Sequence, residues 1–158
     1  MKKTQKGFSL IELLIVVAII LIIAAIAIPN LLRSKMAANE ASAVGSLRTL
    51  NTAAVTFSTS YGGYPPTLAA LLPPASGNAS STAADLVDSV LGGGTKSGYA
   101  FTWTAGNSDA NGNYQTYTIS AAPTSLGTTG QRYFFTNQSG VIRAAVSTTA
   151  TAASSPLS

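Results

Sequence analysis

Glu12 is the residue of this sequence with the clearest potential for chemistry, because it is the only charged residue between Phe8 and Ile28. The rest of that run is apolar, apart from Ser9. A carboxylate in a membrane-spanning helix costs about 2.5–3.5 kcal/mol on insertion scales, and less near the interface, so it tends to be retained for a function. The pattern therefore predicts a functional carboxylate. A merely tolerated side chain that reaches back to water is the alternative.

The run that contains Glu12 is long enough to cross a membrane. At a rise of 1.5 Å per residue, residues 8–28 form about 30 Å of helix, which matches the hydrocarbon core of a bilayer. Three lysines precede the run within residues 1–7, and basic flanks hold that end in the cytoplasm, so the rest of the chain faces outward. A secretory signal peptide would have a shorter apolar core, whereas helical spacing continues here beyond Pro29. A simple signal anchor fits the length but leaves Glu12 unexplained.

The residues around Glu12 form a long motif, in which Gly7-Phe8-Ser9-Leu10-Ile11-Glu12 opens the apolar stretch and Ala27-Ile28-Pro29 closes it. Over roughly residues 1 to 60, the chain resembles the type IV pilins and their relatives, the pseudopilins of type II secretion. In that family a prepilin peptidase cuts after the glycine, the new N-terminal residue is methylated on its amine, and the glutamate takes part in assembly. The resemblance therefore implies cleavage between Gly7 and Phe8, N-methylation of Phe8, and assembly roles for Glu12 and Pro29.

Physical chemistry supports this role for the glutamate. An α-amine created at Phe8 would be a cation facing the membrane interior, where an unpaired charge is costly. Within one helix, Glu12 lies one turn from Phe8 and is able to pair with that amine. In a filament of staggered helices, Glu12 could instead neutralise the amine of a neighbouring subunit. The sequence leaves both arrangements open.

The resemblance implies a structural protein and not an enzyme. It implies a precursor that spans the bacterial inner membrane once and is then polymerised into an extracellular type IV pilus. Its partners would be copies of itself, the prepilin peptidase, the inner-membrane pilus assembly machinery and, before assembly, membrane lipid. The alternative is a pseudopilin that builds a short piston for type II secretion. The motif disfavours a monomeric, membrane-anchored binding domain.

Beyond the membrane run, residues 31–61 predict a second helical half. Pro29 removes one backbone donor and crowds the carbonyl of Ala25, which predicts a kink rather than a plain break. Glu40 interrupts an otherwise apolar stripe, and Gly62-Gly63 predicts the end of the helix. The stripe has spacings of three, four and seven and consists of Met36, Ala43, Leu47, Leu50, Ala54, Phe57 and Tyr61.

The region after Gly63 predicts a small antiparallel sheet. Alternating side chains and turn residues favour strands at 99–104, 114–121, 132–136 and 141–145, with a tight turn at 137–140. Before them, we expect one helical turn at 67–72 and a short helix that Ser81 or Thr82 caps and that runs to Leu91. The fold class is therefore α+β, with one face of an antiparallel meander packed on the outer half of the long helix.

The predicted organisation has five parts. A cleaved basic leader covers residues 1–7, the transmembrane and filament-core half of the helix 8–29, and its outer half 30–62. A globular domain follows at 63–146, and a Ser/Thr/Ala-rich tail at 147–158 is expected to be disordered. Many pilins close their C-terminal region with a disulfide, but this sequence has no cysteine, so that region must be held in another way.

Composition excludes several classes of site. The absence of His and Cys removes the commonest nucleophile–base pairs and most zinc sites, and we expect no cofactor. Nine basic and five acidic residues give a formal charge of +4, but three of the basic residues lie in the leader. The remaining chain is nearly neutral and has no Lys/Arg cluster, which argues against dedicated nucleic-acid binding.

Two loops show partial motifs. Gly94-Thr95-Lys96-Ser97 lacks the glycine that precedes the lysine of a phosphate-binding loop. Asp109, Asn111 and Asn113 alternate as calcium ligands do, but no acidic residue downstream completes a cage. We prefer a polar hairpin loop there and keep these three residues as a candidate metal loop.

Overall fold

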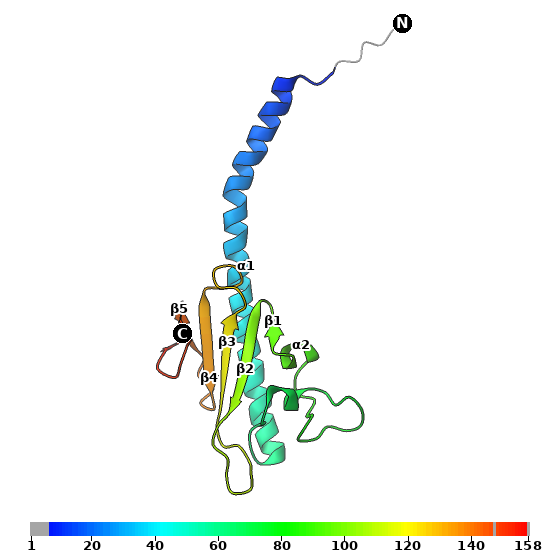
Figure 1. Ribbon diagram of the computed structural model, residues 1–158, viewed down its shortest axis with the longest axis vertical. Coiled ribbons are helices and arrows are strands. Elements are labelled where there is room, and N and C mark those ends of the chain that lie inside the picture. Colours follow the sequence, from blue (N-terminus) through cyan, green and yellow to red (C-terminus); the bar gives the residue numbers. More distant parts are fainter. Residues whose placement is uncertain (1–6, 147, 158) are drawn as a thin grey trace. The chain divides into compact units, whose positions relative to one another are not determined.

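The computed structural model describes residues 7–146 and 148–157, and it has the predicted α+β fold. One long helix, α1 (Leu10–Tyr61), is followed by a 3-10 turn, η1 (Leu68–Leu71), a short helix, α2 (Ser89–Gly92), and a six-stranded sheet (Figure 1). All strand pairs are antiparallel, and the strands follow one another in sequence order. The strands are β1 (Thr95–Lys96), β2 (Tyr99–Ala105), β3 (Tyr117–Pro123), β4 (Arg132–Asn137), β5 (Arg143–Val146) and β6 (Ser155–Pro156).

Helix α1 has 52 residues and continues through Pro29, so there is no plain break at that position. It ends where predicted, because Gly62 has a φ of +81° and its N–H donates to the carbonyl of Ser58 at 2.9 Å. Contacts divide the chain into an N-terminal unit that ends at Lys35 and an outer unit, Met36–Ser158. The two units are described separately.

The outer unit is built around the stripe predicted on α1. Ala43, Leu47, Leu50 and Ala54 are fully buried, and Phe57 is almost so, which confirms the centre of the stripe. Met36 and Tyr61, at its two ends, are only partly buried. The stripe packs against inward-facing residues of the sheet in a single core, which includes Tyr99, Phe101, Tyr117, Ile119 and Phe134.

The register of the sheet places these core residues in rows. Phe101 pairs with Ala121, Ala121 with Phe134, and Phe134 with Ala144. The predicted alternation in residues 99–104 and the turn at 137–140 are both confirmed. Strand β3 begins at Tyr117, three residues later than predicted, because Tyr114 forms isolated bridges with Tyr64 and Ser108 instead.

A polar bridge ties α1 to the middle of the sheet. The Asn51 amide nitrogen donates to the hydroxyl of buried Thr136 at 3.0 Å, and the Tyr117 hydroxyl donates to the Asn51 carbonyl oxygen at 3.1 Å. Burial raises the pKa of Tyr117 to about 12, so the phenol stays a donor. Since buried polar groups need matched partners, this bridge favours one register of the helix on the sheet.

The predicted helix from Ser81 or Thr82 to Leu91 is wrong. Only residues 89–92 are helical, and the cap is Asp88, whose carboxylate accepts from the Leu91 N–H at 2.7 Å. The segment before it is non-helical and is held against η1, since the Ala84 N–H donates to the carbonyl of Ala70 and the Leu86 N–H to that of Leu71. Tertiary backbone hydrogen bonds therefore replace the helical ones that the local sequence suggested.

The expected disorder of the tail is also wrong for residues 148–157, while residues 147 and 158 lie outside the described residues. Strand β6 pairs with β5, and the Leu157 N–H donates to the carbonyl of Ile142 at 2.9 Å. Arg143 donates through Nη1 to the carbonyl of Ser154 at 2.8 Å, and Ala150 is only 2% exposed. These contacts hold the C-terminal region in a chain that has no disulfide.

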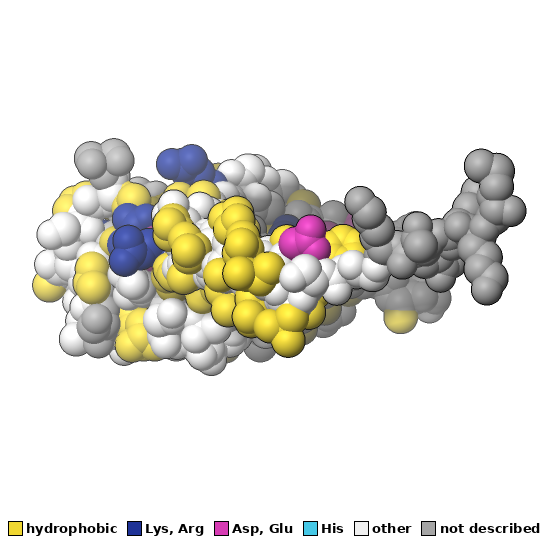
Figure 2. Space-filling model, turned by 90° about the horizontal axis from the view of Figure 1, so that it is seen from above, with side chains coloured by type: hydrophobic (Ala, Val, Ile, Leu, Met, Phe, Trp, Pro, Cys, Tyr) yellow, Lys and Arg dark blue, Asp and Glu magenta, His cyan; other side chains and the backbone are white. Residues whose placement is uncertain are grey.

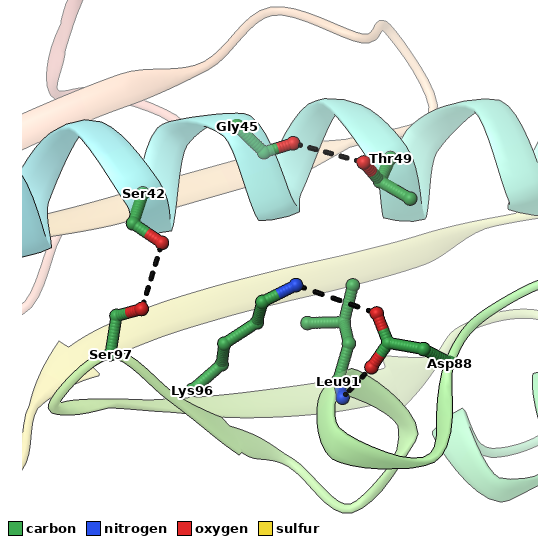
Figure 3. Close-up of polar contacts among 7 residues, drawn as sticks. All are labelled: Ser42, Gly45, Thr49, Asp88, Leu91, Lys96 and Ser97. Atoms are coloured by element: carbon green, nitrogen blue, oxygen red, sulfur yellow. Dashed lines mark hydrogen bonds and ion pairs between the residues drawn. The ribbon is translucent and has the colours of Figure 1, made fainter.

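Strand β1, which the sequence did not predict, forms a hairpin with β2 (Figure 3). The turn residues Ser97 and Gly98 both have positive φ, 50° and 72°, as a two-residue type I′ hairpin turn requires. The Ser97 hydroxyl hydrogen-bonds the hydroxyl of Ser42 on α1 at 2.9 Å, and Lys96 reaches Asp88 at 3.4 Å. The partial phosphate-loop motif is therefore a β-hairpin.

Candidate assembly site at the N-terminus

The candidate cleavage position lies in non-helical chain. Gly7, Phe8 and Ser9 precede the first residue of α1, and the Phe8 side chain is 88% exposed. A Cβ added at Gly7 would meet nothing within 4 Å. The bond between Gly7 and Phe8 is thus accessible, and the chain itself imposes no steric need for glycine there.

Glu12 lies in the first turn of α1, and its position shows a contact that the sequence analysis missed. Its Oε2 accepts a hydrogen bond from the Ser9 N–H at 2.8 Å. This is half of a capping box, in which an acidic residue at the third helical position reaches back to the N–H of the N-cap residue. The signal in the sequence is Ser9-Leu10-Ile11-Glu12, a Ser-x-x-Glu pattern at the start of a helix.

The capping contact uses one oxygen of the carboxylate. Among the described residues, the other oxygen, Oε1, has no hydrogen-bond partner. The carboxylate is therefore held near the positive end of the helix dipole and keeps one oxygen for a cation. Helix capping and charge pairing are compatible roles for the same side chain.

Pro29 is the other predicted assembly residue, and the structure does not bring it near Glu12. The two residues are both in α1, where 17 positions correspond to about 25 Å along the axis. Between them, large apolar side chains face outward, as at Leu21 and Ile26, which are 63% and 70% exposed. Among the described residues, α1 is the one helix long and apolar enough to span a membrane, and none of its most apolar window is buried. In the view of Figure 2, the hydrophobic side chains (yellow) form clusters, and few Lys, Arg, Asp or Glu side chains lie among them.

The candidate metal loop is organised around hydrogen bonds. Asp109 Oδ1 accepts from the N–H groups of Asn111 and Asn113, both at 2.9 Å, and Oδ2 accepts from the Gln115 side-chain amide at 3.2 Å. The hydrogen bond from Asn113 is the main reason why the pKa of Asp109 lies below its usual value. Since N–H donors occupy both oxygens, the geometry favours the polar hairpin loop. The described residues contain no group of three His, Cys, Asp or Glu side chains that could hold a metal ion.

Glu40 is a second carboxylate whose role the sequence did not reveal. It is 8% exposed, and its Oε1 accepts from the N–H groups of Gln131 and Arg132 at 2.8 and 3.2 Å. Its Oε2 pairs with Arg132 Nε at 2.7 Å. Burial favours the neutral acid, but the Gln131 hydrogen bond and the Arg132 guanidinium outweigh it, so the pKa of Glu40 lies below its usual value. Glu40 thus joins α1 to the start of β4.

Comparison with known proteins identifies the N-terminal segment. The family model described as the prokaryotic N-terminal methylation motif matches residues 2–28. No solved structure matches the chain significantly.

The curated relatives are major pilus proteins. The chain is 60% identical over 38 residues to the type IV wide pilus major component PilA4 of Thermus thermophilus, a match that covers 24% of this chain and 29% of that protein. It is 49% identical over 53 residues to the type IV major pilin protein PilA of Myxococcus xanthus, covering 34% and 24%. It is 54% identical over 52 residues to the type IV major fimbrial protein FimA of Dichelobacter nodosus, covering 31% and 33%.

These matches span a third or less of the length of each relative, and none of the names denotes an enzyme. Residues 2–28 therefore carry the N-terminal methylation motif, and over about a quarter to a third of its length the chain is similar to major type IV pilins.

Proposed function

We propose that this chain is a structural subunit of an extracellular type IV pilus, cut between Gly7 and Phe8, methylated on the Phe8 amine and polymerised through α1. One observation carries the proposal: the helix behind the methylation motif exposes a continuous apolar surface that the described chain does not cover. A surface of that size in an isolated chain requires a partner. Lipid before assembly and other copies of α1 after assembly would both supply one.

The proposed mechanism is packing. Burying one large aliphatic side chain stabilises a contact by about 1.5–3 kcal/mol, so a helix with many exposed Leu, Ile and Val residues gains a great deal when copies associate. Such a gain is nearly independent of axial position, because the run is apolar apart from Ser9 and Glu12. Glu12 would supply the missing specificity by pairing with the Phe8 amine of a neighbouring subunit.

The organisation proposed from the sequence fits this mechanism. Residues 1–7 would be the leader, which the prepilin peptidase removes on the cytoplasmic side, and residues 8–29 the half that lies first in the inner membrane and later in the filament core. Residues 30–62 and 63–146 would form the outer part of the subunit, to which the ordered tail at 148–157 belongs. The curated matches are to major pilus proteins, and no observation favours the pseudopilin alternative.

The direct test is to isolate surface filaments from the native cells and to identify their main subunit by mass spectrometry. We expect a subunit that starts at Phe8 and carries one methyl group on its amine. Filaments built from a chain that keeps Met1, or that starts after Ala27, would contradict the proposal. A chain that is never found in filaments would contradict it as well.

Replacing Gly7 with tryptophan is expected to leave uncut precursor in the membrane. A Cβ at this position meets nothing within 4 Å, and the position precedes the folded part of the chain, so we expect the effect to arise in the peptidase and not in the fold. Membrane fractions analysed by immunoblot and mass spectrometry measure the ratio of precursor to mature chain. Lys6→Ala is the neighbouring control and should still be processed. Normal processing of Gly7→Trp would rule out this cleavage position.

A fragment that starts at residue 34 is expected to be a soluble monomer. It keeps all the buried core residues of α1 and the whole sheet, and it lacks the exposed apolar run. Sedimentation velocity and circular dichroism check its mass and fold. Its stability should be modest, because no disulfide restrains the unfolded chain. Oligomers that persist in dilute solution would place the assembly contacts in the outer unit.

A further inference from the structure

We infer that a hollow at the C-terminal end of α1 binds a neutral saccharide ring. The hollow has a volume of about 220 Å³ and lies entirely in the outer unit. Its walls include three tyrosines, Tyr61, Tyr64 and Tyr114, and its polar groups include Ser81, Thr82 and Asn113. These residues come from the end of α1, the segment after it, the loop before α2 and the loop before β3.

The aromatic walls are fixed by packing. The ring of Tyr61 lies 4.6 Å from that of Phe57, and the ring of Tyr64 lies edge-on to Tyr117 at 4.7 Å. Tyr117 in turn stacks on Trp103 at 4.7 Å with an interplanar angle of 8°. A backbone hydrogen bond of 2.8 Å from the Tyr64 N–H to the Tyr114 carbonyl joins two of the walls. Because packing already fixes these rings, they offer apolar faces to a ligand with little further loss of conformational entropy.

The loop that carries Asn113 is also held in place. Asp109, the centre of the former candidate metal loop, accepts hydrogen bonds from the Asn113 N–H at 2.9 Å and from its side-chain amide at 3.5 Å. On the other side, the chain passes so close that a Cβ on Gly63 would lie 2.7 Å from the Cβ of Asn113. The unusual hydrogen bonding of this loop therefore acts to position a wall of the hollow.

The polar groups of the hollow favour a ligand with several hydroxyls. Among the described residues, the hydroxyls of Tyr61, Tyr64 and Tyr114 make no hydrogen bond, and neither does that of Ser81. Each of these groups can both donate and accept. A pyranose ring has the matching character, because its C–H faces pack on aromatic rings while its hydroxyls lie at the rim.

The charge of the hollow selects against other ligands. No Lys, Arg, Asp or Glu lines it, so phosphates, carboxylates and sialic-acid-type sugars would lose hydration without gaining a partner. Two other hollows in the outer unit are both lined by Arg48 and lack aromatic walls. A neutral sugar is therefore the chemistry that fits this position.

Saturation-transfer difference NMR on the detergent-solubilised full-length chain tests the inference. The probes are methyl β-D-glucopyranoside, methyl β-D-galactopyranoside and N-acetylglucosamine, with choline chloride as a competing small cation. We expect transfer to the ring C–H protons of at least one sugar and none to choline. No transfer to any sugar, or transfer to choline alone, would overturn the inference, the latter in favour of an aromatic cation cage.

Conservative variants separate binding from folding. Tyr114→Phe combined with Ser81→Ala removes two free hydroxyls and keeps every ring, and we expect the affinity to fall about threefold to tenfold per lost hydrogen bond. Tyr133→Phe removes a hydroxyl from β4, outside the hollow, and should leave the affinity unchanged. Circular dichroism confirms that each variant is folded. Equal affinities in the double variant and the wild type would overturn the inference.

Discussion

Replacing Glu40 with alanine is expected to destabilise the outer unit by about 3 kcal/mol. The substitution leaves the N–H groups of Gln131 and Arg132 without their acceptor and removes the partner of the Arg132 guanidinium. An unsatisfied buried donor costs about 1–3 kcal/mol, and removing one partner of a buried ion pair about 3–5 kcal/mol. Arg132 is 41% exposed and can rehydrate, which places the total near the lower end of these values.

Thermal unfolding of the detergent-solubilised chain, followed by circular dichroism, measures this effect. A loss of about 3 kcal/mol corresponds to a fall in Tm of roughly 10 °C for a unit of this size. Arg48→Ala is the matched control, because it removes a charge from the exposed side of the same helix and should change Tm little. If Glu40→Ala unfolds at the same Tm as the wild type, the contacts of Glu40 do not stabilise the outer unit.

The same contact predicts a pH dependence. The pKa of Glu40 in the folded chain lies below its usual value, so its stabilising contribution is complete above the pKa of the unfolded chain. It is lost as the pH falls through the folded-state pKa. We therefore expect the wild type to lose more stability than Glu40→Gln when the pH is lowered from about 6 towards 3. The pKa values of Asp88 and Asp109 are also lowered. Their protonation destabilises both proteins to the same extent, so this effect cancels in the comparison.

The parts of the fold that follow a regular period could be predicted from the sequence. The stripe on α1 and the alternation in β2 are the periodicities of a helix and of a half-buried strand, and both are confirmed. Glu40 interrupts that stripe, and its partner could not be predicted, because Gln131 and Arg132 lie 91 and 92 residues away. An acidic residue on an apolar stripe is the available signal, since a buried charge needs a partner.

The predictions that failed depend on contacts between distant segments. Residues 81–88 have helical composition, but hydrogen bonds to Ala70 and Leu71 hold residues 84–87 in a non-helical conformation. The tail is Ser/Thr/Ala-rich, which suggests disorder. However, the edge of β5 that does not pair with β4 forms backbone hydrogen bonds with the tail. In both segments the local propensities are weak, and tertiary hydrogen bonds decide the conformation.

The candidate assembly site was predictable in its residue types but not in its geometry. The motif indicated Gly7, Phe8 and Glu12, while the hydrogen bond from the Ser9 N–H to Glu12 was overlooked although its Ser-x-x-Glu signal is local. The partner of the free oxygen of Glu12 would belong to another copy of the chain. A contact between copies leaves no periodicity or spacing in the sequence of a single chain, so it could not be predicted.

The capping contact makes Glu12→Gln the most informative substitution in this protein. Glutamine at this position can still accept from the Ser9 N–H, because capping boxes use either Glu or Gln, but it cannot neutralise an amine. If charge pairing registers the subunits, the Phe8 amine of a neighbour is left unpaired at a cost of about 3–5 kcal/mol. That cost weakens subunit addition more than about a hundredfold.

We therefore expect Glu12→Gln and Glu12→Ala to insert and to be cleaved, with mature subunits that accumulate in the membrane while few filaments form. Electron microscopy of cells and quantification of sheared filaments measure the yield, and immunoblots of membranes measure cleavage. Normal piliation of Glu12→Gln with loss in Glu12→Ala would assign Glu12 to helix capping alone. Uncut precursor in both variants would assign it to recognition by the peptidase. Loss of filaments in both, with cleavage intact, would leave the charge as the property that assembly requires, because capping survives in only one of them.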